Sequence, residues 1–103
     1  MRVTIIRDDD MVYVDGLPLR VDCSSLPERF HALQWYGTWG EVEMKDSDGR
    51  HVDNIHITDL GAYRGQIDAW LKEKVRFDAA QAAALAAVPP IKTTAKGAVN
   101  VIA

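Results

Sequence analysis

The sequence predicts an α+β domain: an antiparallel β-meander of about four to five strands with one C-terminal α-helix packed on one face. Two patterns indicate this fold. Residues 41–45 alternate strictly between apolar and charged side chains, as a half-buried strand does. Residues 60–71 carry large apolar side chains at helical spacing. The chain has 103 residues, which is enough for one hydrophobic core and too few for two.

The first elements along the chain form a predicted hairpin. Residues 3–7 are short and rich in β-branched side chains, and three aspartates at 8–10 interrupt them. Residues 11–14 restore strand character before Asp15 and Gly16 turn the chain. Residues 17–21 alternate but contain Pro18, so they are expected at a sheet edge or in an extended loop.

The middle of the chain predicts the rest of the meander. Residues 24–29 contain serine and proline and are expected to have little regular structure. Residues 31–36 form the next predicted strand, followed by a glycine turn at 37–40. After the alternating strand at 41–45, residues 46–49 form a turn and residues 50–57 return as a strand. A bulge is expected near 53–54, where the apolar phase slips.

The predicted helix starts near Leu60, with Thr58 or Asp59 as its cap. Its sheet-facing stripe should end near Val75, because polar side chains interrupt the stripe afterwards. Residues 78–88 are mostly alanine, which favours helix but offers little area to bury, and Pro89 ends the helix. We therefore expect one domain at 1–77, followed by an alanine-rich helical extension and a flexible tail at 78–103. The predicted stripe contains Leu60, Tyr63, Ile67, Trp70 and Leu71.

Composition excludes several classes of protein. The net charge of −3, without clustered Lys or Arg, argues against nucleic-acid binding. No apolar stretch approaches the length of about 20 residues that a membrane span needs. The single cysteine, Cys23, cannot form an intramolecular disulfide and has no basic neighbour in sequence, so it is expected to be an inert thiol in a reducing compartment.

No motif for catalysis, a metal or a cofactor is recognisable. The aspartates at 8–10 and 46–48 fit turns better than a calcium loop. His51 and His56 are five residues apart, which places them on opposite faces of a regular strand. We therefore expect neither an enzyme nor a bound metal or cofactor.

The aromatic residues Trp35, Tyr36 and Trp39 allow two interpretations. In a strand, Trp35 and Tyr36 point to opposite faces, so one is expected in the core and the other at the surface, while Trp39 lies in a turn. A small cluster closed by the turn is the favoured interpretation. A partner-binding patch is the alternative, because Trp and Tyr are frequent at binding hot spots. The candidate partner-binding residues are Trp35, Tyr36, Trp39, Leu85 and Val88.

Two segments carry a family resemblance that covers roughly residues 2–75. Together they resemble small proteins encoded by tailed bacteriophages and prophages, often near tail genes. The first segment is Val3-Thr4-Ile5-Ile6-Arg7-Asp8-Asp9 with Val12-Tyr13-Val14-Asp15-Gly16; the second is Leu26-Pro27 with His31-Ala32-Leu33-Gln34-Trp35-Tyr36-Gly37 and Gly40-Glu41-Val42-Glu43.

The resemblance implies a non-enzymatic tail or tail-fibre assembly factor, or a minor virion component, that acts through protein contacts. It also implies a location in the host bacterial cytoplasm or the virion. The alternatives are a phage-encoded binder of a host protein and, third, a hydrolase whose site is assembled only in three dimensions. Self-association through the C-terminal helix is a further expectation. No nucleic-acid or membrane partner is expected.

Overall fold

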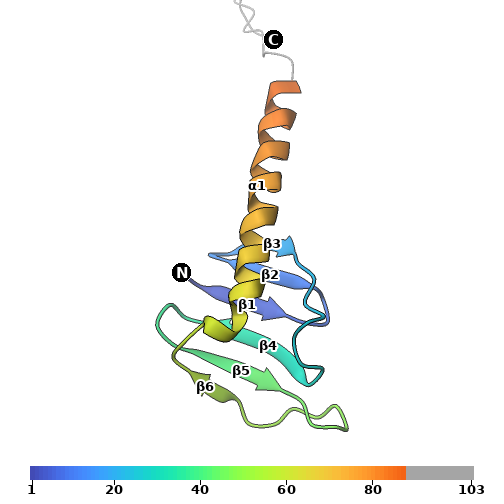
Figure 1. Cartoon of the computed structure of the whole chain (residues 1–103), viewed down its shortest axis with the longest axis vertical. Helices are drawn as coiled ribbons and strands as arrows, with labels where there is room; N and C mark the ends of the chain where they lie inside the picture. The colour runs from blue at the N-terminus through green and yellow to red at the C-terminus, as the bar shows by residue number, and fades with distance from the viewer. Residues whose placement is uncertain (88–103) are drawn as a thin grey trace, which may run out of the picture.

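The computed structural model describes residues 1–87, which form one antiparallel sheet and one long helix (Figure 1). The strand order is β3-β2-β1-β4-β5-β6, so two three-stranded meanders join through β1 and β4. The predicted α+β fold is confirmed, with six strands instead of about four to five. The strands are β1 Val3–Ile6, β2 Met11–Val14, β3 Leu17–Arg20, β4 Phe30–Trp35, β5 Gly40–Met44 and β6 Ile55–Ile57.

The turn between β2 and β3 follows directly from its two residues. Asp15 and Gly16 both have positive φ, at 49° and 87°. That pair of angles matches the two-residue hairpin turn whose twist suits the flanking strands. β3 lies at the sheet edge and pairs only with β2. Pro18 has no backbone N–H to donate, and no further strand on its outer side needs one.

The return strand after β5 is shorter than the sequence predicts. Only Ile55–Ile57 pairs with β5 as a strand, and Lys45 and His51 form an isolated bridge. The Asp46 carboxylate accepts the backbone N–H groups of both Asp48 and Arg50. These two donors are therefore used within the turn and are not available for strand pairing. The prediction of a bulge near 53–54 was also wrong, because the register shifts in β4, between Phe30 and Ala32.

A short 3₁₀ turn, η1 Gly61–Tyr63, leads into α1 Arg64–Ala87. The Asp59 carboxylate accepts the backbone N–H of Gly61, but Leu60 occupies the N-cap position without a side-chain cap, so the predicted cap by Thr58 or Asp59 was wrong. α1 packs on β2 and β3. No helix within residues 1–87 is long and apolar enough to cross a membrane.

The core lies between one face of the sheet and the layer formed by α1 and the loop at residues 21–29. Alternate residues of the inner strands point into it, and Val21, Cys23 and Leu26 close it from the loop. The most deeply buried side chains are Phe30, Ile5, Leu33, Ile67, Val3, Val12 and Cys23.

The helix docks through a face that is rotated from the predicted stripe. Ile67 and Trp70 are buried as predicted, but Leu71 exposes 51% of its surface, so its assignment to the core was wrong. Two polar contacts set the rotation. The Gln66 amide donates to Ser25 Oγ at 3.1 Å, and the Trp70 indole N–H donates to the Leu17 carbonyl at 3.1 Å. Both satisfy a buried donor, so the docked face includes Gln66, and Leu71, about 140° around the helix from Gln66, is left at the surface.

The second half of α1 projects beyond the sheet (Figure 1). Every residue from 78 to 87 is helical and exposed. The described chain accordingly measures 66 Å along its longest axis, against 27 and 20 Å along the others.

Within residues 1–87, no helix covers the other face of the sheet. Residues that pair directly across neighbouring strands share a face of the sheet. One such row on this open face takes one residue from each of the six strands: Pro18, Tyr13, Thr4, Gln34, Glu41 and His56.

Candidate functional site

An aromatic stack lies at one end of the open face, formed by Arg2, Tyr36, Trp39 and His56. The Tyr36 and Trp39 ring centroids are 4.6 Å apart with the planes at 42°. The Trp39 and His56 rings stack at 5.4 Å with the planes at 21°. The Arg2 guanidinium carbon lies 5.1 Å from the centre of the Tyr36 ring, within cation–π range.

Three separate segments of the chain bring this stack together. Arg2 precedes β1, Tyr36 and Trp39 flank the β4–β5 turn, and His56 is in β6. The Tyr36 N–H donates to the Trp39 carbonyl at 2.8 Å, which closes the turn between them. Tyr36 and Trp39 each expose 39% of their surface. The stack is therefore an ordered aromatic patch whose remaining exposed surface is open to a partner.

A polar network borders the stack at the β6 edge. Asn54 Nδ2 donates to Glu41 Oε1 at 2.7 Å, and Asn54 Oδ1 lies 2.9 Å from His51 Nε2. Glu41 is the direct cross-strand neighbour of His56. The network fixes the segment before β6, and thereby the position of His56 under Trp39.

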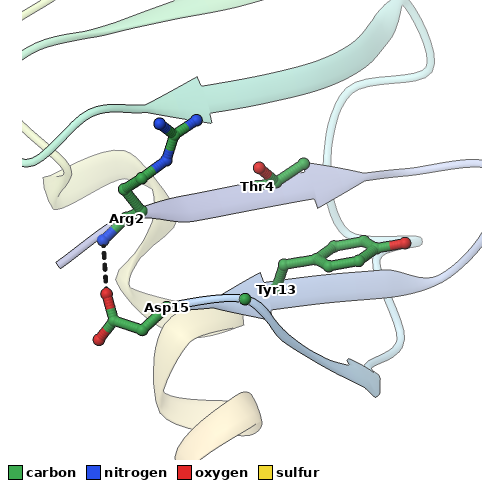
Figure 2. A pocket seen from close by; sticks show the side chains of 5 residues that line it. Arg2, Thr4, Tyr13 and Asp15 are labelled. Carbon is green, nitrogen blue, oxygen red and sulfur yellow. Dashed lines mark hydrogen bonds between the residues drawn. The ribbon is translucent and has the colours of Figure 1, made fainter.

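On the side of the stack away from β6, the open face has a shallow hollow of about 520 Å³ over β1 and β2. Figure 2 shows Arg2, Thr4, Tyr13 and Asp15 around it. The Asp15 carboxylate accepts the backbone N–H of Arg2 at 2.8 Å, and the Thr4 hydroxyl donates to Gln34 Oε1 at 2.8 Å. A carboxylate, hydroxyl groups and a guanidinium suit the binding of polar groups and provide no paired nucleophile and base.

The projecting part of α1 forms a second exposed surface. We call residues 71–87 the projecting segment. Leu71, Val75 and Leu85 expose 51%, 69% and 74% of their surfaces. Lys74 Nζ contacts both Asp78 oxygens at 2.7 and 2.8 Å, and Arg76 pairs with Glu73 at 2.8 Å. Residues 79–87 carry no charge at all.

The structure separates the candidate partner-binding residues. Trp35 faces the core and Tyr36 the open face, which is the alternation expected of a strand. Trp39 contacts Tyr36 in the stack, whereas Leu85 lies on the projecting segment, and Val88 is outside the described residues. Arg2 and His56 were not predicted as part of this site, because only the strand register brings them to Tyr36 and Trp39.

The reactive side chains singled out in the sequence have structural roles. Burial raises the pKa of the Cys23 thiol to about 11, and the nearby carboxylates of Asp10 and Asp22 add to the effect. A thiol with that pKa is protonated at neutral pH and is a poor nucleophile. Asp8 pairs with Lys45 at 3.3 Å, and Asp10 accepts the Cys23 N–H at 3.0 Å.

His31 occupies the bulge in β4 and lines a small hollow of about 140 Å³ with Met44 and His51. Its Nδ1 atom is buried and has no hydrogen-bond partner among the described residues. Residues 1–87 contain no group of three or more His, Cys, Asp or Glu side chains placed to hold a metal ion. Two imidazoles alone do not complete the usual four-ligand set of a structural zinc site.

Comparison with known proteins gives no relative: no family model, no curated protein and no solved structure matches this chain.

Proposed function

We propose that this protein is a non-enzymatic interaction protein, a tail or tail-fibre assembly factor or minor virion component of a tailed phage. The observation that carries the proposal is the projecting segment. Leu71, Val75 and Leu85 are largely exposed on a helix that extends past the sheet. Exposed apolar side chains that gather on one element favour a protein contact, because their burial is the main driving force for association.

The aromatic stack offers a second surface, for the same kind of partner or, in the alternative, for a host protein. Tyr36 and Trp39 are partly exposed on an ordered platform, at a site separate from the projecting segment. Aromatic side chains held in place lose little conformational freedom on binding, which is why they are frequent at hot spots. A partner that binds there would use the open face and leave the helix free.

Site-specific photo-crosslinking tests these assignments in cells that produce phage particles. A benzophenone amino acid replaces Leu85 on the helix or Trp39 in the stack, and exposed Arg50 serves as the control position. We expect an adduct with a phage structural protein from position 85, and peptides of this chain in purified particles. An adduct with a host protein from position 39 would favour the alternative. Position 85 giving no adduct beyond that at position 50 would refute the role of the helix.

A further inference from the structure

The aromatic stack and the hollow belong to one continuous surface on the open face. The Tyr36 ring contacts Trp39 on one side and the Arg2 guanidinium on the other. Arg2 is bonded through its backbone to Asp15, at the rim of the hollow. We call Asp15, Arg2, Tyr36 and Trp39 the band. It runs along one end of the neighbouring strands β2, β1, β4 and β5, which makes it roughly 14 Å long.

A row of hydrogen-bonding side chains lies beside the band, one step further along the same strands. Its members pair with one another across the sheet and are all half-buried: Tyr13, Thr4, Gln34 and Glu41. The Thr4 hydroxyl donates to Gln34 Oε1, and Glu41 Oε1 accepts a hydrogen bond from Asn54. These bonds hold the amide and the carboxylate in place. The open face therefore offers flat rings next to oriented hydrogen-bonding groups.

This combination matches the two-sided chemistry of a sugar. A pyranose ring has carbon-bound hydrogens on its faces, which pack on aromatic rings. Its rim carries hydroxyl groups, which bond to amide, carboxylate and guanidinium groups. We propose that the band binds an oligosaccharide, with sugar rings on Tyr36 and Trp39 and hydroxyl groups bonded to Arg2, Gln34 and Glu41. This activity goes beyond the proposed function and uses a surface away from the projecting segment.

The size of the exposed aromatic surface favours a small ligand over a protein. Tyr36 and Trp39 are each 39% exposed, so together they offer roughly 100–200 Å². A standard protein interface takes about 800 Å² from each partner, and its core is poor in charged side chains. Here the charged Arg2 lies against the Tyr36 ring. The hollow of about 520 Å³, in contrast, falls within the range of roughly 300–1,000 Å³ that is usual for small-molecule sites.

Charge disfavours a nucleic acid, the other ligand that stacks on aromatic rings. Single strands are held by a positively charged groove that follows their phosphates. The band and the polar row contain two carboxylates, Asp15 and Glu41, against the single guanidinium of Arg2. Within residues 1–87, no carboxylate lies at ion-pair distance from that guanidinium. Its N–H groups are therefore free to donate to a sugar hydroxyl or to the carboxylate of an acidic sugar.

NMR titration of the isotope-labelled full chain tests sugar binding and locates it. The neutral probes are cellohexaose, maltohexaose and chitohexaose, and the acidic probe is hexagalacturonate. Each is added up to about 10 mM, which reaches the weak affinity expected of a shallow site. We expect at least one probe to shift the Trp39 indole N–H and the amides of Tyr36 and Gln34, and to leave residues 79–87 unchanged. Stronger binding of hexagalacturonate would assign Arg2 to a sugar carboxylate, and stronger binding of a neutral probe to hydroxyl groups.

Variants of the two parts of the site give the second test. Trp39→Ala removes one ring and Gln34→Leu removes the amide at similar size, and each should weaken binding about three- to tenfold. Ile55→Ala is the matched control, because it shortens an exposed apolar side chain on the opposite face and should leave affinity unchanged.

The proposal would be overturned if no probe shifted the Trp39 indole N–H, or if Trp39→Ala and Ile55→Ala had equal effects. A host-protein adduct from position 39 without sugar binding would assign the stack to a protein and overturn the proposal as well. An adduct with a phage structural protein from position 85 tests the proposed function separately, so either idea can fail alone.

Discussion

The orientation of α1 on the sheet predicts sharply different costs for two substitutions one helical turn apart. Ile67 is 2% exposed, whereas Leu71 is 51% exposed. Ile67→Ala removes three buried carbon groups at about 0.8 kcal/mol each and leaves a cavity between helix and sheet. We expect it to lower the free energy of unfolding by about 2–5 kcal/mol. Leu71→Ala removes a half-exposed side chain and should cost about 1 kcal/mol or less.

Urea unfolding followed by circular dichroism at 222 nm measures both values on the full chain. Thermal melting gives a second estimate, since 1 kcal/mol shifts a domain of this size by roughly 4–8 °C. Both are done at low chain concentration, so that any self-association through the projecting segment adds no stability. Trp70→Phe is a further check: it keeps most of the apolar area but loses the N–H that the Leu17 carbonyl accepts, and should cost roughly 1 kcal/mol.

Equal losses from Ile67→Ala and Leu71→Ala would refute this orientation of the helix. That result would mean that the helix face with both Ile67 and Leu71 packs on the sheet, as the apolar pattern alone predicts. It would also remove Leu71 from the exposed apolar side chains of the projecting segment.

Three further outcomes are expected. The Cys23 thiol should react slowly with a thiol reagent at neutral pH until the chain is unfolded, and stability should fall as pH rises from the unfolded pKa of 9.0 through the folded pKa of about 11, because folding favours the neutral thiol. Trp39→Ala should abolish the upfield ring-current shift of the His56 ring protons in NMR spectra while leaving the fold intact; unchanged His56 shifts would disprove the stack. A chain ending after Phe77 should melt within a few degrees of the full chain at low concentration, since residues 78–87 are exposed; a larger drop would show that they support the fold.

Local patterns were sufficient to predict most of the sheet. The β2–β3 turn at Asp15 and Gly16, the proline-containing edge at β3 and the alternating β5 each depend on neighbouring residues in sequence. The short β6 was not predictable in the same way, because the Asp46 carboxylate competes for the backbone N–H groups that a longer strand would need. Such competition shows only once the turn has its three-dimensional form.

The helix phase and the aromatic stack needed tertiary structure. Apolar spacing could not distinguish Leu71 from Gln66, because Gln66 is buried only through its partner Ser25, 41 residues away. Arg2 and His56 carry no signal that links them to Trp39, since the strand order and register create that neighbourhood. The exposure of Tyr36 opposite buried Trp35, in contrast, follows from strand alternation alone.

The projecting segment is a geometric consequence of where α1 starts on the sheet. In Figure 1 the helix begins over the middle of the sheet and passes over β1, β2 and β3 to the edge, and it contacts β2 and β3. Three strands span roughly 14 Å, which about ten residues of helix cover. α1 has 24 residues, and its last fully buried one, Trp70, is the seventh. The remaining turns therefore have no sheet to pack on, whatever their sequence. Fold stability alone would be served by a helix that ended near Phe77, and the protein contact that we propose for the projecting segment would account for Leu85 at the far end, which is 74% exposed.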